Sequence, residues 1–220
     1  MPSMYETIME LPLFKGIGEE QLSMMLEKTS MEFLKFEDGH IIARPEENVR
    51  AVDFILSGRV RKTYTLENFK ISVDEILGKG SVLGALNLFG METRYCASCV
   101  ALGNVSLLRI EKNQYMNILQ ADKIYMLNFV NYLSAAAQRF PSKALKQKDP
   151  SIFRTLENLV NSFVSRSAET VILSAEPDEL AKFCGTSPEK FNEWKSNALA
   201  HHYIAENHRG IILKSHHKES

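Results

Sequence analysis

Residues 31–110 consist of short apolar segments separated by turns. This pattern constrains the fold of the chain more than any other feature of the sequence. Segments such as 33–36, 40–43 and 52–56 are too short to be helices. The turns between segments lie at Asp38-Gly39, Ser57-Gly58, Gly78-Lys79-Gly80 and Gly103-Asn104. Turns roughly 8–12 residues apart are typical of a small sandwich or barrel. Only residues 82–89 depart from the pattern, and they predict a short helical turn between strands.

Helical periodicity flanks this region on both sides. Residues 4–30 carry apolar side chains at helical spacing, with a break at Gly16 and Gly18. Residues 112–140 predict a long helix, which Pro141 ends because proline cannot continue the hydrogen-bond ladder. The chain therefore belongs to the α+β class, with a strand-rich part between helices.

The long helix has an apolar seam at heptad spacing. The seam consists of Met126, Val130, Leu133, Ala137 and Phe140. Further apolar side chains at Ile124, Leu127 and Phe129 lie on other sides of the helix, so more than one face is expected to be buried. An ordinary core helix fits this pattern, and so does a helix packed between the barrel and a second copy of the chain. The two-sided pattern favours the second, which predicts a homodimer.

Composition narrows the function classes. The chain has 220 residues, a formal net charge of −1 and three cysteines. Balanced charge argues against indiscriminate nucleic-acid binding, although a local binding surface remains compatible with it. An odd, small number of cysteines does not suit a disulfide framework. The sequence has no apolar run long enough to span a membrane and no secretory signal, so we expect a cytoplasmic protein that does not contact membranes.

The last third of the chain predicts a second domain. Residues 141–150 are polar and are expected to form a hinge. A helix over 151–164 and a short strand at 171–173 come next, and two helices and a pair of short strands complete the domain over 151–220.

Residues 178–194 read as a helix-turn-helix. Pro177 can open the first helix, Gly185 supplies the sharp turn, and Ser187 and Pro188 suit the N-cap and first position of the second helix. Plain helix pairs with a glycine turn also exist. Two short strands then flank a basic tip, as in a winged domain. The candidates for DNA contact are Ser187, Glu189, Lys190, Asn192, Glu193, Ser196, His208 and Arg209.

This order of parts resembles the Crp/Fnr family of bacterial transcription regulators over essentially the full length. The supporting segments are 11–14, 53–60, 80–84 and 178–187. The resemblance implies a cyclic-nucleotide-binding-like β-roll or jelly-roll sensor at 1–121, a dimerisation helix at 122–140 and a winged helix-turn-helix at 151–220. It also implies a homodimer that binds double-stranded DNA at a roughly palindromic site, an effector in the barrel, and contact with RNA polymerase.

The expected effector pocket departs from that of the cyclic-nucleotide-binding members of this family. Its residues would be Leu83, Gly84, Ala85, Leu86, Arg94, Tyr95 and Cys96. Ala85 stands where those members carry a glutamate for the ribose, and Tyr95 stands where an arginine pairs with the phosphate. Arg94 lies one residue early, and a shifted loop would bring it into place. Phe140 replaces a polar group that would meet the purine. We therefore expect no cyclic AMP binding of the usual kind, and the effector is unknown.

Other cofactors are also not expected. Cys96 and Cys99 have CxxC spacing, but in a strand they would point to opposite faces. No cysteine precedes Cys96, whereas the iron–sulfur members of the family carry an N-terminal cluster, so neither an iron–sulfur cluster nor another metal site is predicted. His40 could ligate haem, but a surface histidine is the simpler interpretation, and Cys184 is expected to be a buried apolar group.

The second helix of the motif also differs from that of the best-known members. Pro188, Glu189 and Glu193 occupy the positions where those members use arginine, glutamate and arginine, so the target site should differ. Lys190 and Lys195 could meet phosphates or simply be solvated. No nucleophile–base pair or metal triad indicates an enzyme. The alternative is a ligand-binding or protein-interaction module whose DNA binding has degenerated.

Overall fold

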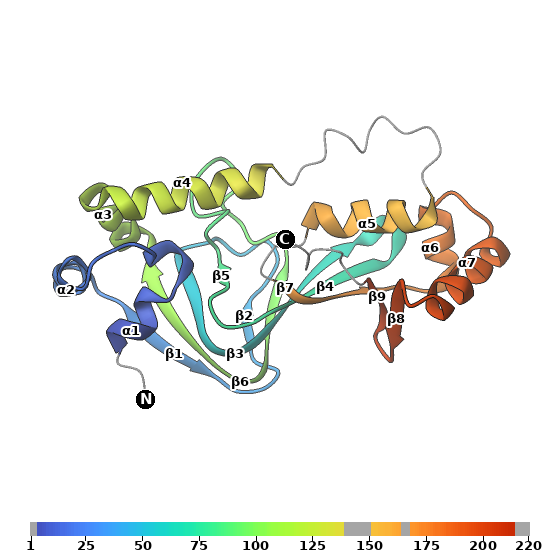
Figure 1. The fold of residues 1–220 in the computed structure, drawn as a ribbon, viewed down its shortest axis with the longest axis horizontal. Coiled ribbons are helices and arrows are strands. Elements are labelled where there is room, and N and C mark those ends of the chain that lie inside the picture. The colour runs from blue at the N-terminus through green and yellow to red at the C-terminus, as the bar shows by residue number, and fades with distance from the viewer. Residues whose placement is uncertain (1–3, 139–150, 164–167, 214–220) are drawn as a thin grey trace. The chain divides into compact units, whose positions relative to one another are not determined.

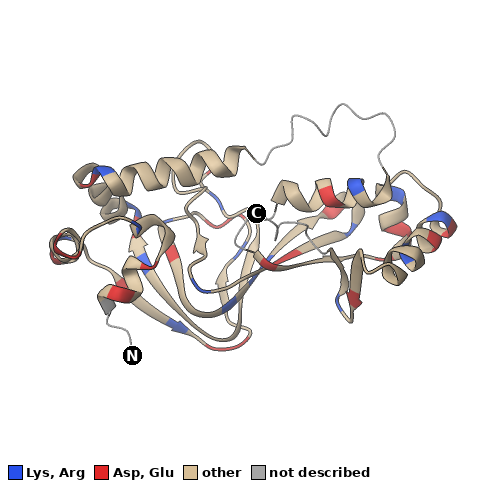
Figure 2. Ribbon diagram, viewed as in Figure 1, with Lys and Arg blue, Asp and Glu red and all other residues tan. Residues whose placement is uncertain are grey.

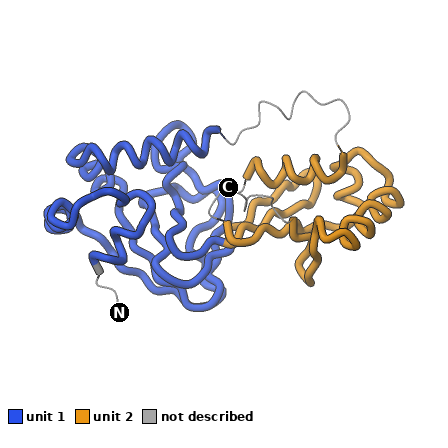
Figure 3. Tube along the Cα trace, in the orientation of Figure 1, with its two compact units in different colours: residues 1–61, 77–138 blue, residues 62–76, 139–220 orange. Residues whose placement is uncertain are grey.

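The computed structural model describes residues 4–138, 151–163 and 168–213, which form two compact units. Unit 1 comprises residues 1–61 and 77–138, and unit 2 comprises 62–76 and 139–220 (Figure 3). The outer part of one β-hairpin, residues 62–76, thus belongs to the unit that holds the C-terminal helices.

Unit 1 is a strand-rich body with four helices (Figure 1). Its strands are β1 (Glu32–Phe36), β2 (Ile41–Ala43), β5 (Val82–Leu83), β6 (Ser98–Glu111) and the first part of β3 (Ala51–Leu66). Strand β6 pairs antiparallel with β1 and β2, and β5 pairs antiparallel with β3. The predicted α+β class with a roll of antiparallel strands is confirmed. The helical turn predicted over 82–89 is wrong, because residues 82–83 form β5 and only turns follow.

Side chains of β3 alternate between two cores, as the pleat of a strand requires. Val52 and Phe54 enter the core shared with the helices, whereas Ile55 enters the barrel core. The helical core receives residues from α1 (Met4–Met9), the 3-10 turn η1 (Pro12–Phe14), α2 (Glu19–Lys28) and the two helices after β6. Phe14 lies at its centre, with its ring 4.8 Å from that of Tyr125 and 5.6 Å from that of Phe54.

The helical stretch predicted over 112–140 is broken at Asp122, where the dimerisation helix was predicted to begin. Helix α3 spans Lys112–Ala121 and α4 spans Lys123–Ala137. Asp122 has extended backbone angles, and its carboxylate accepts a hydrogen bond from the Tyr125 N–H at 2.8 Å. An aspartate that caps a new helix satisfies an N–H that would otherwise be unpaired. The aspartate therefore begins α4 in a new direction.

Unit 2 contains α5 (Ile152–Phe163), β7 (Ala168–Ser174), α6 (Pro177–Phe183), α7 (Pro188–Ala200), β8 (Ile204–Asn207) and β9 (Gly210–Leu213). The predicted helix over 151–164 is α5 and the predicted strand at 171–173 is part of β7. The predicted pair of helices is α6 and α7, and the predicted pair of short strands is β8 and β9. Strand β4 (Ile71–Leu77) lies beside β7, followed by β9 and β8. The hairpin end adds aromatic contacts, since the Phe69 ring, in the short turn η2 (Glu67–Phe69), lies 5.1 Å from that of Phe183.

No helix among residues 4–138, 151–163 and 168–213 is both long enough and apolar enough to cross a membrane.

Candidate effector site and nucleic-acid interface

The turn after β5 is packed tightly against the barrel. Leu83 and Ala85 are each 2% exposed, and Leu86 faces solvent. Gly84 has a φ of +78°, and a Cβ added to it would lie 2.6 Å from the Ala51 carbonyl oxygen and 3.2 Å from the Tyr95 hydroxyl. The backbone conformation and the close neighbours both require glycine here. Of the predicted pocket residues, Leu83 and Ala85 are thus core residues.

Tyr95 occupies the space beside this turn. Its side chain packs against both the barrel core and the helical core. Its backbone is fixed on both sides, because its N–H donates to the Glu47 carbonyl at 2.9 Å and its carbonyl accepts from the Glu46 N–H at 2.9 Å. The hydroxyl therefore lies beside Gly84, where an effector bound to this turn would need room.

Arg94 faces away from the same space. Its guanidinium forms an ion pair with the Glu46 carboxylate at 3.1 Å, and both side chains are mostly exposed. The loop shift that would bring Arg94 into the pocket is not present, since the Tyr95 backbone is held in register. Cys96, the last of the predicted pocket residues, is exposed.

A buried ion pair that the sequence analysis did not identify lies in the barrel. Asp53 on β3 is fully buried, and both of its oxygens accept hydrogen bonds from Arg109 on β6, at 2.7 and 2.8 Å. The hydrogen bonds to Asp53 raise the pKa of Arg109, and Tyr95 contributes to the same shift. Alternation along β3 and β6 places the pair on the side of Ile55 and Leu107, which belong to the barrel core. The barrel thus neutralises its own buried charge.

Cysteine and histidine do not cluster in the described parts of the chain. Cys96 is exposed and Cys99 is buried; the prediction that both lie in one strand is wrong, because β6 begins at Ser98 and contains only Cys99. His40 is exposed and its ring lies 4.9 Å from that of Phe36. Among the described residues, no three His, Cys, Asp or Glu side chains are grouped so as to hold a metal ion.

Helix α4 has one buried face and one exposed apolar face. Tyr125 is fully buried and Phe129 is 5% exposed, which fixes the helix to unit 1. Met126, Leu127 and Val130 are 46%, 57% and 48% exposed. Of the other predicted seam residues, Leu133 packs partly on the helical core, Ala137 is exposed, and Phe140 lies outside the described residues, as does the predicted hinge at 141–150.

The helix-turn-helix is formed by α6 and α7. Leu180 and Ala181 of α6 and Phe191 and Ala198 of α7 are buried, as the motif requires. Gly185 has a φ of +65°, in the left-handed region that glycine adopts without strain. The Ser187 hydroxyl caps α7 by accepting from the Lys190 N–H at 3.4 Å. Cys184 is half-buried, and burial raises the pKa of its thiol to about 11.

The side chains expected to meet DNA share one property, since all of them are exposed. They are Ser187, Glu189, Lys190, Asn192, Glu193 and Ser196 on and before α7, and His208 and Arg209 in the turn between β8 and β9. Hydrogen bonds from its own N–H and from the Ser187 hydroxyl lower the pKa of Glu189. This carboxylate therefore stays anionic at the start of α7.

The turn between β8 and β9 is held by two side chains, since the Ser174 hydroxyl of β7 donates to the Arg209 carbonyl at 2.5 Å and Asn207 binds the backbone from within the hairpin. The Asn207 Oδ1 accepts hydrogen bonds from the N–H groups of Arg209 and Gly210, at 2.8 and 3.2 Å. This turn holds the Arg209 backbone in place and leaves its side chain exposed. Lys195 differs from expectation, because its ammonium is paired with Glu206 of β8 at 2.5 Å. Figure 2 shows acidic and basic residues mixed along these elements.

Comparisons with known proteins give the following matches. The family model described as "Cyclic nucleotide-binding domain" matches residues 33–122. The structure is similar to the catabolite activator protein of Thermus thermophilus, with a TM-score of 0.53 and 19% identity over 92% of this chain and 93% of that chain. It is also similar to the sensor domain of the transcriptional regulator DNR from Pseudomonas aeruginosa, with a TM-score of 0.52 and 18% identity over 66% of this chain and 93% of that chain. The sequence matches none of the curated proteins.

Proposed function

We propose that this chain, whose residues 33–122 belong to the cyclic nucleotide-binding domain family and whose fold is that of the Crp/Fnr-type regulators, is a DNA-binding transcription regulator. The observation that carries the proposal is the exposed face of α7. Every polar side chain predicted to meet DNA is exposed, while Leu180, Ala181, Phe191 and Ala198 of the motif are buried. A recognition helix needs this division, because it reads base edges with exposed side chains near its N-terminus.

The proposed mode of binding places α7 in the major groove. Glu189 and Asn192 lie in the first turns of α7, where they would meet bases, and a carboxylate can accept from a cytosine amino group. Lys190 and Arg209 are exposed and would meet phosphates. Lys195 is not assigned this role, because Glu206 already pairs with it.

The proposed assembly is a homodimer through α4. Its Met126, Leu127 and Val130 are about half exposed and form an apolar surface on a helix that Tyr125 and Phe129 hold against unit 1. Exposed apolar patches of this kind mark interaction sites. Two α7 helices related by a two-fold axis would then read two half-sites about one helical turn apart. At promoters where this dimer activates transcription, it would contact RNA polymerase.

The proposed regulation does not use cyclic AMP in the usual way. Tyr95 fills the space beside Gly84, Arg94 is paired outside with Glu46, and Arg109 is paired with Asp53. A buried phosphate needs a paired cation, and none of these arginines is free for it without breaking an existing pair. Calorimetric titration with cyclic AMP should give no heat of binding. Clear micromolar binding would contradict this part of the proposal.

Selection from random double-stranded DNA with purified protein tests DNA recognition. We expect enrichment of a palindrome whose half-sites lie about one helical turn apart. Enrichment of a single half-site would contradict the dimer. No enrichment, with or without small molecules from cell extract, would contradict DNA recognition itself.

A second candidate function is a regulatory module that has lost DNA binding, and the acidic face of α7 favours it. Glu189 and Glu193 both point outward and Lys195 is already paired. The substitution Glu193→Gln removes one charge from that face without touching the core. In a DNA-binding protein it should strengthen binding to random duplexes and leave a steep salt dependence, since phosphate contacts release counterions. A module without DNA binding would show neither effect.

A further inference from the structure

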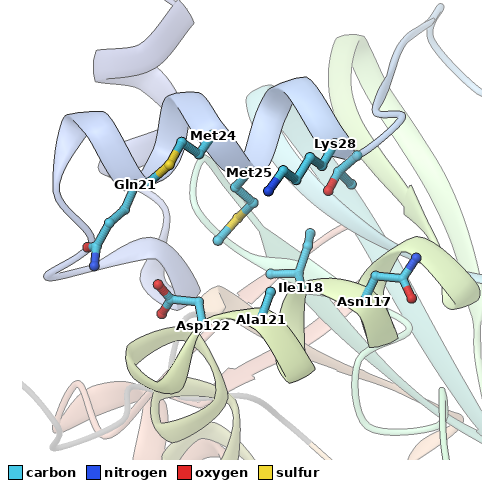
Figure 4. Close-up of a pocket in the computed structure, with 9 residues that line it drawn as sticks. Gln21, Met24, Met25, Lys28, Asn117, Ile118, Ala121 and Asp122 are labelled. Carbon is cyan, nitrogen blue, oxygen red and sulfur yellow. The ribbon is translucent and has the colours of Figure 1, made fainter.

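Away from the barrel, unit 1 contains a cavity of about 390 Å³ between α2 and the junction of α3 with α4. Small-molecule sites are commonly roughly 300–1,000 Å³. Its walls are shown in Figure 4, where Gln21, Met24, Met25 and Lys28 come from α2, and Asn117, Ile118, Ala121 and Asp122 come from α3 and the residue after it. These residues are remote in sequence and are brought together by the fold.

The cavity has an apolar floor. Met25 is 8% exposed and Ile118 is 1% exposed, and Ala121 lies beside them. In Figure 4, Met25 points down from α2 toward Ile118 and Ala121. This floor would bury a short aliphatic body without leaving polar groups unsatisfied.

Two opposite charges stand over this floor. Lys28 lines the cavity from α2, where its side chain runs alongside the helix, and Asp122 lines the opposite wall from the residue after α3 (Figure 4). Among the residues that the structure describes, none forms an ion pair or a hydrogen bond with the Lys28 ammonium. The Asp122 Oδ1 caps α4, which leaves its second oxygen able to accept. Lys28 and Asp122 therefore offer a place for one anionic and one cationic group.

We propose that this cavity binds a small aliphatic zwitterion of the free amino-acid type. Its carboxylate would pair with Lys28, its ammonium would donate to Asp122, and its apolar side chain would lie on Met25 and Ile118. A simple anion would leave Asp122 unpaired and a simple amine would leave Lys28 unpaired, whereas a zwitterion satisfies both. This site stands apart from the proposed DNA-binding function and does not depend on it.

The cavity also reaches the beginning of α4, because Asp122 both lines it and caps that helix. A bound ammonium on the free oxygen would hold the Asp122 side chain in its capping position. Occupancy should therefore stabilise the α3–α4 junction and raise the melting temperature by mass action.

The test is calorimetry and thermal melting of the full chain with the twenty free amino acids, and with two analogues of leucine. 4-Methylpentanoate has the carboxylate but no amine, and isoamylamine has the amine but no carboxylate. We expect at least one aliphatic amino acid to bind and raise the melting temperature, and each analogue to bind at least about tenfold more weakly. No binding by any amino acid, or equal binding by either analogue, would overturn the proposal.

Three variants test whether the amino acid binds in this cavity. Lys28→Gln removes the cation, and Asp122→Asn removes the negative charge while keeping a residue that caps helices well. Each should weaken binding of that amino acid by about tenfold or more. The matched control is Glu27→Gln, an exposed neighbour outside the cavity, which should leave binding unchanged. Unchanged binding in both cavity variants would show that the ligand binds elsewhere and would overturn the assignment.

Discussion

In the barrel, the residues expected to form an effector pocket are largely packed into the protein itself, since Leu83 and Ala85 are buried and the Tyr95 hydroxyl lies beside Gly84, whereas on α7 all the residues expected to meet DNA are exposed. Tyr95 packs beside Gly84, and Asp53 pairs with Arg109. On α7, Glu189 and Glu193 make no contribution to the buried core. From this difference we expect a substitution at the barrel site to lower the free energy of unfolding. A substitution of an exposed residue on α7 should instead change the affinity for DNA.

The largest expected effect is at the buried ion pair. Asp53→Asn removes the charge that compensates Arg109, so it should lower the free energy of unfolding by about 3 kcal/mol, at the low end for buried pairs because Arg109 is 27% exposed. Urea unfolding measures this loss.

The exposed pair of Arg94 with Glu46 is the matched control. Glu46→Gln should cost less than about 1 kcal/mol, as surface pairs do. Replacing both Asp53 and Arg109 with leucine should recover much of the loss. A loss below about 1 kcal/mol for Asp53→Asn would show that the barrel does not depend on this pair.

The next effect is at the turn after β5. Gly84→Ala should cost about 2–3 kcal/mol, because a side chain would meet both the left-handed backbone and the Ala51 carbonyl oxygen. Gly90→Ala serves as the control, since Gly90 also has a positive φ of +97° but has nothing within 4 Å of an added Cβ. It should cost only about 1 kcal/mol. Equal losses in the two variants would mean that the turn is not tightly packed.

A smaller effect is expected at the start of α7. Ser187→Ala removes the cap on the Lys190 N–H and should cost about 1 kcal/mol in thermal or urea unfolding. Ser196→Ala, on the exposed face of the same helix, should change stability by less than about 0.5 kcal/mol. If Ser196→Ala were the more costly change, that face would be part of the packing.

The smallest effect is chemical and depends on pH. Burial raises the pKa of the Cys184 thiol to about 11, so at pH 8 it should remain protonated. Because the thiolate is the nucleophile, alkylation of Cys184 by iodoacetamide should be slow at pH 8 and accelerate as pH rises toward 11. Exposed Cys96 supplies the comparison by peptide mass spectrometry. Reaction of Cys184 at pH 8 as fast as that of Cys96 would argue for a reactive thiol.

Local patterns predicted much of the fold. The turns between short strands, the helix of α4 and the motif of α6 and α7 all depend on residues close together in sequence, and each of these elements is present, whereas the dimer seam predicted on α4 stays a prediction. The break at Asp122 carried a signal, because aspartate is a strong helix cap, but the apolar periodicity continues across it. The prediction of a helical turn over 82–89 is wrong because the apolar run in these residues fits a helix, whereas Gly84 adopts a turn conformation.

Contacts between distant residues could not be predicted. Asp53 and Arg109 are 56 residues apart, and only the pairing of strands brings them together. The same holds for the cavity, whose walls come from α2 and α3. Lys195 could be placed on α7 from the sequence, but its pairing with Glu206 depends on where β8 packs. Which side chains meet between different helices and strands depends on the tertiary packing. A pattern of neighbouring residues in the sequence does not predict it.

The most direct test of the contrast between a barrel without the usual cyclic-AMP contacts and an exposed α7 proposed to read DNA is the affinity of the protein for its selected DNA site, with and without saturating cyclic AMP. Fluorescence anisotropy on one labelled duplex is sufficient. The account predicts specific, salt-dependent binding that is the same in both conditions. Binding that appears only with cyclic AMP, or that strengthens about tenfold or more with it, would contradict the account.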